Sequence, residues 1–310
     1  MEFLAKGKKE HNNDNLKKLS IVIALNIAIV LGQIIFGIIA NSLSLITDAL
    51  HNLQDVISLV ISLIAIIFMR KSPSLHMTFG YLRSPVFAAF INTSFLIGAI
   101  FVIFISSINR LLNPEPVESI YVIVVGFFAF VINSISAFVL KEHNHHHHED
   151  NHHHHHDEDI NIKSAYLHLI TDAGLSLAVV IGGIFIYLFN LYWIDPIISI
   201  LFSVYIFKES IPIIKKSFYI LMEGAPKHID IDKIVRDIKN LPAVKDIHDV
   251  HLWALSDKDI YFSAHIILED ISISGFDEIL SNIEKILSKE GINHITIQPE
   301  SEKYKCEIYY

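Results

Sequence analysis

Six apolar stretches constrain the fold of this 310-residue chain more than any other feature. A helix needs about 20 mostly apolar residues to cross the hydrocarbon core of a bilayer. The stretches that are long enough run over residues 19–40, 43–69, 86–108, 118–140, 164–189 and 191–212. Charged residues make up 18% of the chain and gather outside these stretches, whereas a soluble domain carries about 25%. We therefore expect an α-helical membrane bundle of six transmembrane helices over residues 19–212, in contact with lipid.

The basic residues between the stretches predict their orientation, because lysine and arginine concentrate in cytoplasmic connections. On one side of the predicted bundle lie Lys6, Lys8, Lys9, Lys17, Lys18, Arg70, Lys71, Arg83, Lys141, Lys163, Lys215 and Lys216. The other side has only Arg110. We therefore expect both ends of the chain in the cytosol. Residues 1–18 are polar and lysine-rich and lack the apolar core of a signal peptide, so we interpret them as an uncleaved cytosolic tail.

Residues 213–310 have the pattern of a small soluble domain. Two amphipathic segments predict helices at 228–241 and 276–291, with Gly291 as the stop of the second. Alternating apolar residues predict strands at 244–255, 260–268 and 292–299. The order α-β-β-α-β indicates a cytosolic α+β domain.

Two of the apolar stretches carry the same pair of ionisable residues. His51 and Asp55 lie four residues apart in the second stretch, as do His168 and Asp172 in the fifth. An Asp at the centre of a membrane helix costs about 2.5–3.5 kcal/mol on insertion scales, and residues four apart share one helix face. Two such helices face to face would offer two imidazoles and two carboxylates, a set that suits tetrahedral zinc. A pair that only fixes helix packing need not repeat this order and spacing, so we favour a metal site.

Asp48 precedes His51 by three residues and shares much of its helix face. Three roles are open to it: a fifth ligand, a partner that orients a histidine ring, or a proton acceptor. We favour an orienting or proton-pathway role over direct ligation, and Asn52 flanks the same face. Neighbouring hydroxyls are expected to bond to helix backbone: Ser44, Thr171 and Ser176.

The remaining patterns narrow the class of function. The chain has no HExxH motif, no P-loop and no basic patch, so nothing predicts an enzyme, an ATP-driven pump or a nucleic-acid partner. Zinc requires neutral histidine and ionised aspartate, so zinc and protons compete for such a site. We therefore expect a secondary transporter that exchanges zinc for protons. An uncoupled metal channel and a membrane-anchored zinc sensor or buffer remain the alternatives.

Residues 143–159 form a histidine-rich, acidic segment between the fourth and fifth stretches. Its composition cannot bury an apolar face, so it is expected to be disordered. An affinity tag is a poor explanation, since the run is internal and broken by Glu149, Asp150 and Asn151. We expect an accessory loop that captures metal weakly, through His143, His145, His146, His147, His148, His152, His153, His154, His155 and His156.

The motifs together resemble the cation diffusion facilitator family, in particular its bacterial and vertebrate zinc exporters. "SLSLITDALHNLQD" is similar to the second-span signature of that family and "AYLHLITDAGLS" to the fifth. "FGYLRSPVFAAFIN" resembles the start of its third span, and "DIHDVHLWAL", "SAHIIL" and "HITIQPE" resemble its soluble domain. The resemblance runs from the first span to Glu300.

This resemblance implies a homodimeric zinc–proton antiporter that works by alternating access, with His51, Asp55, His168 and Asp172 as its transport site. It also implies a ferredoxin-like fold for residues 213–310, which dimerises and binds zinc in many relatives. Residues at or near those metal-binding positions are His248, His265, His294 and Glu300, while Asp249 and His251 are close enough to substitute.

Two matters stay open at the level of sequence. Many relatives have an acidic residue where this chain has Pro85, two after Arg83, which puts a dimer-linking contact in doubt. The ligand types suit zinc, with cadmium, cobalt and iron as further candidates, but copper(II) binds such ligands more tightly. Metal selectivity, proton stoichiometry and affinity therefore do not follow from the sequence. A bacterial plasma membrane fits the short connections.

Overall fold

The computed structural model describes residues 26–69, 71–145 and 156–303. At residues 59, 62, 66, 139–145, 156–166 and 168 it describes the backbone alone. The described chain forms two compact units. The helical unit comprises residues up to Val60 together with 92–211, and the sheet unit comprises residues 61–91 together with those from Pro212 onward.

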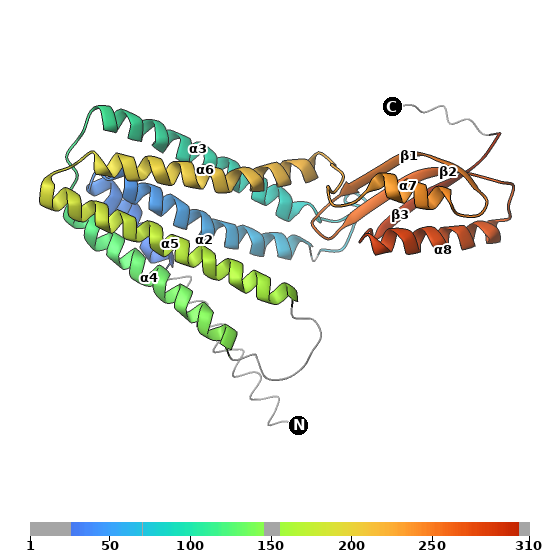
Figure 1. Cartoon of the computed structure of the whole chain (residues 1–310), viewed down its shortest axis with the longest axis horizontal. Helices are drawn as coiled ribbons and strands as arrows, with labels where there is room; N and C mark the ends of the chain where they lie inside the picture. Colours follow the sequence, from blue (N-terminus) through green and yellow to red (C-terminus); the bar gives the residue numbers. More distant parts are fainter. Residues whose placement is uncertain (1–25, 70, 146–155, 304–310) are drawn as a thin grey trace, which may run out of the picture. The chain divides into compact units, whose positions relative to one another are not determined.

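Long apolar helices build the helical unit (Figure 1). Five are long and apolar enough to cross a membrane, and a shorter apolar helix, Asn26–Ile39, precedes them. The five are α2 (Leu43–Met69), α3 (Ser84–Leu112), α4 (Ser119–His145), α5 (His156–Phe189) and α6 (Ile194–Leu221). The prediction of long apolar helices is thus confirmed for the last five stretches. Of the first predicted span, 19–40, residues 19–25 lie outside the described residues.

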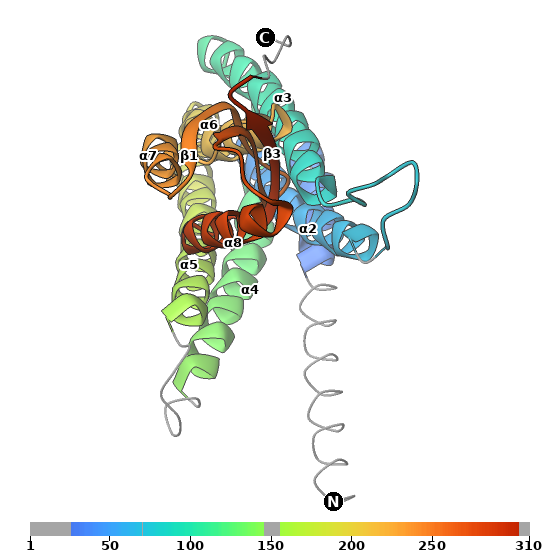
Figure 2. The same cartoon turned by 90° about the vertical axis from the view of Figure 1, so that its right-hand side faces the viewer.

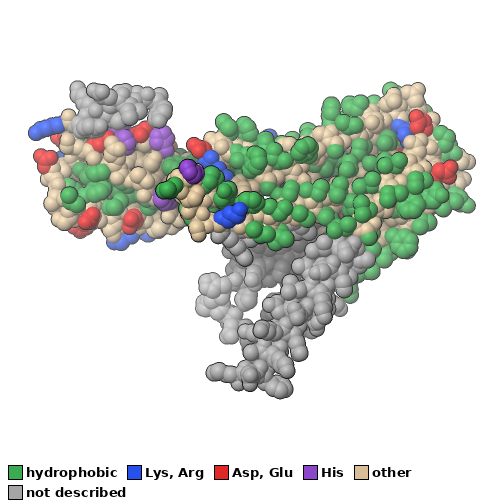
Figure 3. Space-filling model, turned by 180° about the vertical axis from the view of Figure 1, so that it is seen from behind, with side chains coloured by type: hydrophobic (Ala, Val, Ile, Leu, Met, Phe, Trp, Pro, Cys, Tyr) green, Lys and Arg blue, Asp and Glu red, His purple; other side chains and the backbone are tan. Residues whose placement is uncertain are grey.

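The outward surface of these helices exposes many large hydrophobic side chains, which is unfavourable in water. Large hydrophobic side chains such as Phe95 (75% exposed) and Ile38 (67% exposed) point away from the protein, and Figure 3 shows such side chains over much of the helical surface. The interior holds a smaller apolar core around Leu45, Val179 and Phe202. Since soluble monomers rarely expose large contiguous apolar patches, the surface indicates lipid as the solvent.

Helices α4 and α5 lie side by side along their length, as Figures 1 and 2 both show. Glycines make the close approach possible. A Cβ on Gly183 of α5 would lie 2.9 Å from Cγ1 of Ile123 on α4, and one on Gly126 would lie 3.1 Å from Cγ2 of Val180. Small residues at helix interfaces are the usual means of close packing within a bilayer.

The sheet unit holds a three-stranded mixed sheet and two helices, α7 (Ile231–Lys239) and α8 (Ile273–Lys289). Strand β1 (Val244–Ala254) pairs antiparallel with β2 (Ile260–Leu268), and β2 pairs parallel with β3 (His294–Ser301). Apolar residues of both helices share one buried core with the sheet. The predicted order α-β-β-α-β is therefore confirmed.

Local signals in the sequence explain where the two helices of this unit begin and end. The Asp230 carboxylate accepts a hydrogen bond from the Lys233 amide, and the Ser272 hydroxyl accepts one from the Gly275 amide, so each helix has an N-cap. Gly291 follows α8 with φ +80°, a conformation that favours glycine. The prediction that Gly291 stops this helix is confirmed.

Arg83 and Pro85 lie at the start of α3. Arg83 Nη2 forms a salt bridge of 2.8 Å with Glu223 Oε1 of the same unit. Pro85 occupies the first turn of α3, where a missing N–H removes no helix hydrogen bond. The proline is thus compatible with the helix, and the carboxylate paired with Arg83 comes from Glu223.

The histidine-rich segment is described only at its edges. His143 and His145 belong to the last turn of α4, and His156 begins α5. Residues 146–155, which carry the other histidines of the run, lie outside the described residues. The expectation of disorder for this segment stays a prediction.

Candidate metal centre

Three of the four predicted transport-site residues come together between α2 and α5. His51 Nε2 lies 3.0 Å from Asp172 Oδ1. Asp55, one turn after His51 on α2, completes a group whose ligand atoms all lie within 4.8 Å of one another. His51 is 8% exposed and Asp172 3%, while Asp55 is half-buried. One imidazole and two carboxylates thus converge at a point inside the helical unit.

His168, the fourth predicted ligand, belongs to the same helix as Asp172. It lies one turn before Asp172 on α5, so helix geometry puts both residues on one face. Its side chain lies outside the described residues. Its ligand role therefore stays a prediction, and the three described groups carry the geometry of the site.

The chemistry of this group suits a divalent metal ion of intermediate softness. Zinc takes imidazole nitrogen and carboxylate oxygen at about 2.0–2.2 Å, so atoms within 4.8 Å of one another can share one ion. Two carboxylates also balance the charge of a divalent cation, which favours a buried site. The ion would be cargo passing through this position.

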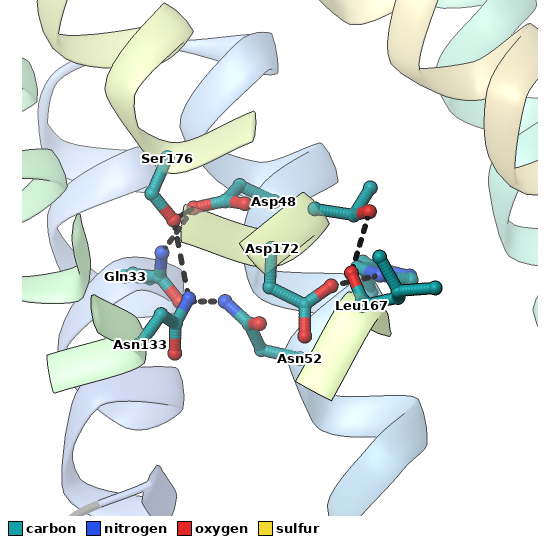
Figure 4. A network of polar contacts seen from close by, with 9 residues as sticks. Gln33, Asp48, Asn52, Asn133, Leu167, Asp172 and Ser176 are labelled. Atoms are coloured by element: carbon teal, nitrogen blue, oxygen red, sulfur yellow. Dashed lines mark hydrogen bonds and ion pairs between the residues drawn. The ribbon is translucent and has the colours of Figure 1, made fainter. Parts of the chain in front are cut away.

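Asp48 and Asn52, predicted neighbours of the site, belong to a different set of contacts on α2 (Figure 4). Asp48 Oδ2 accepts hydrogen bonds from Gln33 Nε2 at 2.5 Å and from Ser176 Oγ at 3.0 Å. Asn52 Nδ2 donates to Gln33 Oε1 at 3.1 Å, and Asn133 Nδ2 donates to Ser176 Oγ at 3.4 Å. We call these five residues the polar cluster. It joins the helix Asn26–Ile39 to α2, α4 and α5.

The interpretation of the hydroxyl side chains was right for Thr171 and wrong for Ser44 and Ser176. Thr171 Oγ1 donates to the Leu167 carbonyl oxygen, a bond within its own helix. Ser176 instead donates to Asp48, and Ser44 donates to Asp195. Both serines face a buried carboxylate from another helix, and a charged acceptor is worth more than a second bond to a carbonyl.

Sequence reasoning also missed Gln33, Asn133 and Asp195 as members of the interior. Each polar residue in an apolar stretch was a signal, because a buried polar group needs a partner. Asp195 lies at the start of α6 but caps α2. It accepts hydrogen bonds from Ser42 Oγ at 2.6 Å, from the Leu43 amide at 2.7 Å, and from the Ser44 amide and hydroxyl at 3.3 and 2.5 Å. A carboxylate is thus held at the positive N-terminal end of α2.

A second group of potential ligands lies on the sheet. His248 and His265 are directly opposite each other on β1 and β2, with ring centroids 5.3 Å apart. Glu300 reaches both from β3: its Oε1 lies 2.9 Å from His265 Nδ1 and its Oε2 3.3 Å from His248 Nε2. The three ligand atoms lie within 4.8 Å of one another.

Asp249 and His294 take different places around this group. The Asp249 Oδ2 atom lies 3.4 Å from His265 Nε2, so it contacts the ring nitrogen that Glu300 does not. Its φ of 49° falls at an irregularity of β1 between His248 and His251, which turns its side chain toward β2. His294 does not join the group, because the register of β3 sets it opposite Tyr261, where the two rings lie 4.6 Å apart.

The charges beside this second group favour a cation. The pKa of Asp246, two residues before His248, is lowered, chiefly because Lys239 donates a hydrogen bond to its carboxylate and also through the Ile247 amide. The side chain is 49% exposed, so the effect on stability is small. It nevertheless keeps a negative charge near the histidines at neutral pH.

Comparisons with known proteins cover nearly the whole chain. The family model of the cation efflux transmembrane domain matches residues 19–222. The model of the cytoplasmic domain of cation efflux proteins matches residues 226–302. Both polar groups described above thus lie within matched segments.

Curated relatives of similar length are metal transporters by name. A cadmium, cobalt and zinc/H(+)-K(+) antiporter of Bacillus subtilis is 32% identical over 299 residues, covering 96% of this chain and 93% of the relative. The metal cation efflux system protein CzcD of Cupriavidus metallidurans is 30% identical over 292 residues, covering 94% and 88%. Zinc transporter ZitB of Pectobacterium atrosepticum is 30% identical over 302 residues, covering 97% and 90%.

Proposed function

This chain belongs to the cation efflux family, and we propose that it exports zinc from the cytosol in exchange for protons. The relatives are named as zinc, cadmium and cobalt transporters, and one as an antiporter that uses protons and potassium. The chain is accordingly an integral protein of the bacterial plasma membrane and a transporter, not an enzyme. Cadmium and cobalt are further candidates as cargo.

The contact between His51 Nε2 and Asp172 Oδ1 carries this proposal. A hydrogen bond of 3.0 Å between these atoms requires a proton between them. Zinc needs the lone pairs of the same two atoms, so the proton has to leave before the ion can bind both. Zinc and a proton therefore compete for the same two atoms, His51 Nε2 and Asp172 Oδ1. If the site opens alternately to the two sides of the membrane, this competition exchanges zinc for protons.

We further propose six spans with both ends in the cytosol. The family model begins at residue 19, which supports extending the helix Asn26–Ile39 to a full first span. Arg110, the basic residue on the far side, has its charge balanced by Glu115 at 3.1 Å, with its other guanidinium nitrogen donating to the Asn41 carbonyl oxygen. A single arginine does not outweigh the lysine-rich side in the orientation that these residues predict.

Residues 213–310 are proposed to form a ferredoxin-like domain that forms a homodimer in the cytosol. The cytoplasmic-domain model over residues 226–302 and the α-β-β-α-β order support this assignment. The group of His248, His265 and Glu300 is proposed to bind a regulatory zinc ion. Supporting this, its ligand atoms face one another, with His265 Nδ1 2.9 Å from Glu300 Oε1 and His248 Nε2 3.3 Å from Glu300 Oε2.

Zinc flux under an imposed pH gradient tests the proposed exchange. The full-length protein is reconstituted into liposomes that contain a fluorescent zinc indicator. We expect faster zinc uptake when the lumen is acidic than when both sides have equal pH, and loss of this difference when a protonophore collapses the gradient. Repeating the assay with potassium replaced by sodium shows whether potassium takes part as well.

The outcomes of this assay separate the alternatives. Zinc uptake that ignores the pH gradient would contradict exchange and favour an uncoupled channel. Protein that binds zinc but gives no uptake above empty liposomes would favour a membrane-anchored sensor or buffer.

Removing a ligand of the sheet group should weaken zinc binding without stopping transport. In His265→Ala the full-length protein loses one of three ligands, and we expect it to bind fewer zinc ions per chain by equilibrium dialysis. Zinc flux at saturating zinc should continue, because the transport group on α2 and α5 is intact. His294→Ala is the matched control, since His294 lies against Tyr261 and should leave the zinc count unchanged.

Deleting residues 143–156 tests the accessory role of the histidine-rich segment. Multiple imidazoles capture zinc weakly, so the deletion should raise the zinc concentration needed for half-maximal flux and leave the maximal flux unchanged. Replacing the histidines of this segment by serine, which keeps its length, is the control for a shortened connection. Loss of flux at every zinc concentration in both variants would contradict an accessory role.

A further inference from the structure

We call His51, Asp55 and Asp172 the metal group. Among the described residues of the helical unit, two further aspartates are buried, and their surroundings differ. Asp195 is 1% exposed, and both of its oxygens accept hydrogen bonds, including two from backbone amides at the start of α2. Donors of this kind stabilise the charged form of a carboxylate. Asp195 therefore has donors on both of its oxygens and holds the start of α2 in place.

Asp48 is also 1% exposed, but its two oxygens have different surroundings. Its Oδ2 accepts from Gln33 and Ser176, whereas its Oδ1 is buried and has no hydrogen-bond partner among the described residues. An ionised carboxylate has lone pairs to satisfy on both oxygens. A proton on Oδ1 removes the charge, and a neutral carboxyl group costs less to bury than a carboxylate, while the two donors still occupy Oδ2.

The polar cluster does not offer the oxygens that a metal ion or potassium would need. Gln33 presents its amide N–H to Asp48, and its carbonyl oxygen already accepts from Asn52. The Ser176 hydroxyl likewise gives its hydrogen to Asp48. Figure 4 shows these donors converging on the carboxyl group. Among the buried atoms of the polar cluster, these donors leave only Asp48 Oδ1 without a partner in the described residues, which is too few oxygens to coordinate a metal cation.

The position of Asp48 links its charge to that of the metal group. His51 lies one turn further along α2, and the titratable groups that face Asp48 are His51 and Asp172 on α5. The side chains that the helix Asn26–Ile39 and α4 bring to the polar cluster are neutral amides: Gln33 donates to Asp48, and Asn133 donates to Ser176. Without metal, the group of His51, Asp55 and Asp172 lacks the two positive charges that zinc brings, which favours a proton on Asp48. A bound zinc ion supplies those charges and favours the carboxylate.

We propose that Asp48 binds a proton of the exchange cycle, separate from the proton that zinc displaces between His51 and Asp172. When zinc binds, the Oδ1–H bond breaks, the carboxylate keeps the electron pair, and the proton passes to solvent. When zinc leaves, the carboxylate takes up a proton again. This inference rests on the proposed function, since it adds a proton site to the same exchange.

The coupling is reciprocal by thermodynamic necessity. A proton on Asp48 lowers the zinc affinity of the metal group by some factor. Bound zinc lowers the proton affinity of Asp48 by the same factor. Protons from the side of the membrane to which zinc is exported can thus help to expel zinc, without contact between Asp48 and the ion.

Proton release upon zinc binding tests the proposal directly. Zinc chloride is added to weakly buffered full-length protein in nanodiscs, and a pH indicator reports the protons released per chain. Asp48→Asn keeps the shape and an accepting oxygen but cannot ionise. We expect it to release up to about one proton fewer than wild type at some pH between about 5 and 8. Asp195→Asn, the matched buried aspartate, should release as many protons as wild type.

A second measurement keeps the test valid if a variant is less stable. In proteoliposomes, the pH gradient that just balances a zinc gradient gives the proton-to-zinc ratio even when only part of the protein is active. This ratio should fall for Asp48→Asn and stay unchanged for Asp195→Asn.

The possible results distinguish this proposal from the exchange itself. Equal proton counts and ratios in wild type and Asp48→Asn would overturn the role of Asp48 while leaving zinc–proton exchange intact. Absence of proton release in wild type would overturn the exchange. A variant that loses a dependence on potassium but keeps its proton count would show that the polar cluster serves a monovalent metal cation instead.

Discussion

Asp172→Ala should abolish zinc flux in proteoliposomes. The substitution removes a carboxylate that lies 3.0 Å from His51 Nε2 and leaves that imidazole buried without this partner. Losing a group that only orients a metal ligand already lowers metal affinity 10–100-fold. Losing a ligand should therefore reduce zinc uptake by about 100-fold or more at low zinc, measured as the initial rate of the indicator signal.

Thr171→Ala is the matched control for this change. Thr171 is the neighbour of Asp172 on α5, and its hydroxyl donates to the Leu167 carbonyl oxygen of its own helix. It should fold and transport as wild type does. If Asp172→Ala, correctly folded, kept more than half of the wild-type flux, the group between α2 and α5 would not be the transport site.

Asp195→Ala should cause the largest loss of stability among these substitutions. It removes the acceptor for the Ser42 and Ser44 hydroxyls and for the Leu43 and Ser44 amides, all in the buried first turn of α2. A lost cap costs about 1 kcal/mol and hydrogen bonds to a charged group about 1.5–3 kcal/mol, so we expect a total of about 2–4 kcal/mol. Thermal unfolding followed by tryptophan fluorescence should show a clearly lower midpoint.

Glu115→Ala is the control for removal of a carboxylate as such. Glu115 pairs with Arg110 but is 57% exposed, so its loss should cost less than about 1 kcal/mol. If Asp195→Ala and Glu115→Ala unfolded at the same midpoint temperature, the cap that Asp195 provides would contribute little to stability. Zinc binding at low temperature should survive in both variants, because neither residue belongs to the metal group.

The sequence was sufficient for features that depend on local periodicity. Apolar runs predict the long helices, because hydrocarbon permits few other structures for a spanning segment. The spacing of His51 and Asp55 predicts a shared face, and alternation predicts β1 and β2. Each of these depends on residues close together in the chain, where backbone geometry determines which side chains meet.

Other features depend on which distant segments become neighbours. Asp195 stands beside Pro196 at the start of α6, which suggests a cap for its own helix, yet it caps α2 because the two helix ends meet. The partners of Asp48 come from two other helices, the helix Asn26–Ile39 and α5, whose rotation about their axes the sequence does not determine. His294 was grouped with His265, but the parallel register of β3 aligns Gln298, not His294, with His265.

The contacts within the helical unit also divide its helices into two sets. Asp195 fastens α6 to α2, and hydroxyls of Thr47, Ser199 and Ser107 bond α2, α6 and α3 to one another. The glycine contacts hold α4 against α5. The seam between the two sets is crossed by the hydrogen bond of Ser176 to Asp48, by the contact of His51 with Asp172 and by the close packing of Gly182 against Ile198, so a displacement along the seam would break these contacts. His51 lies on one side of that seam and Asp172 on the other, and the geometry of the ligands would therefore change with every such displacement.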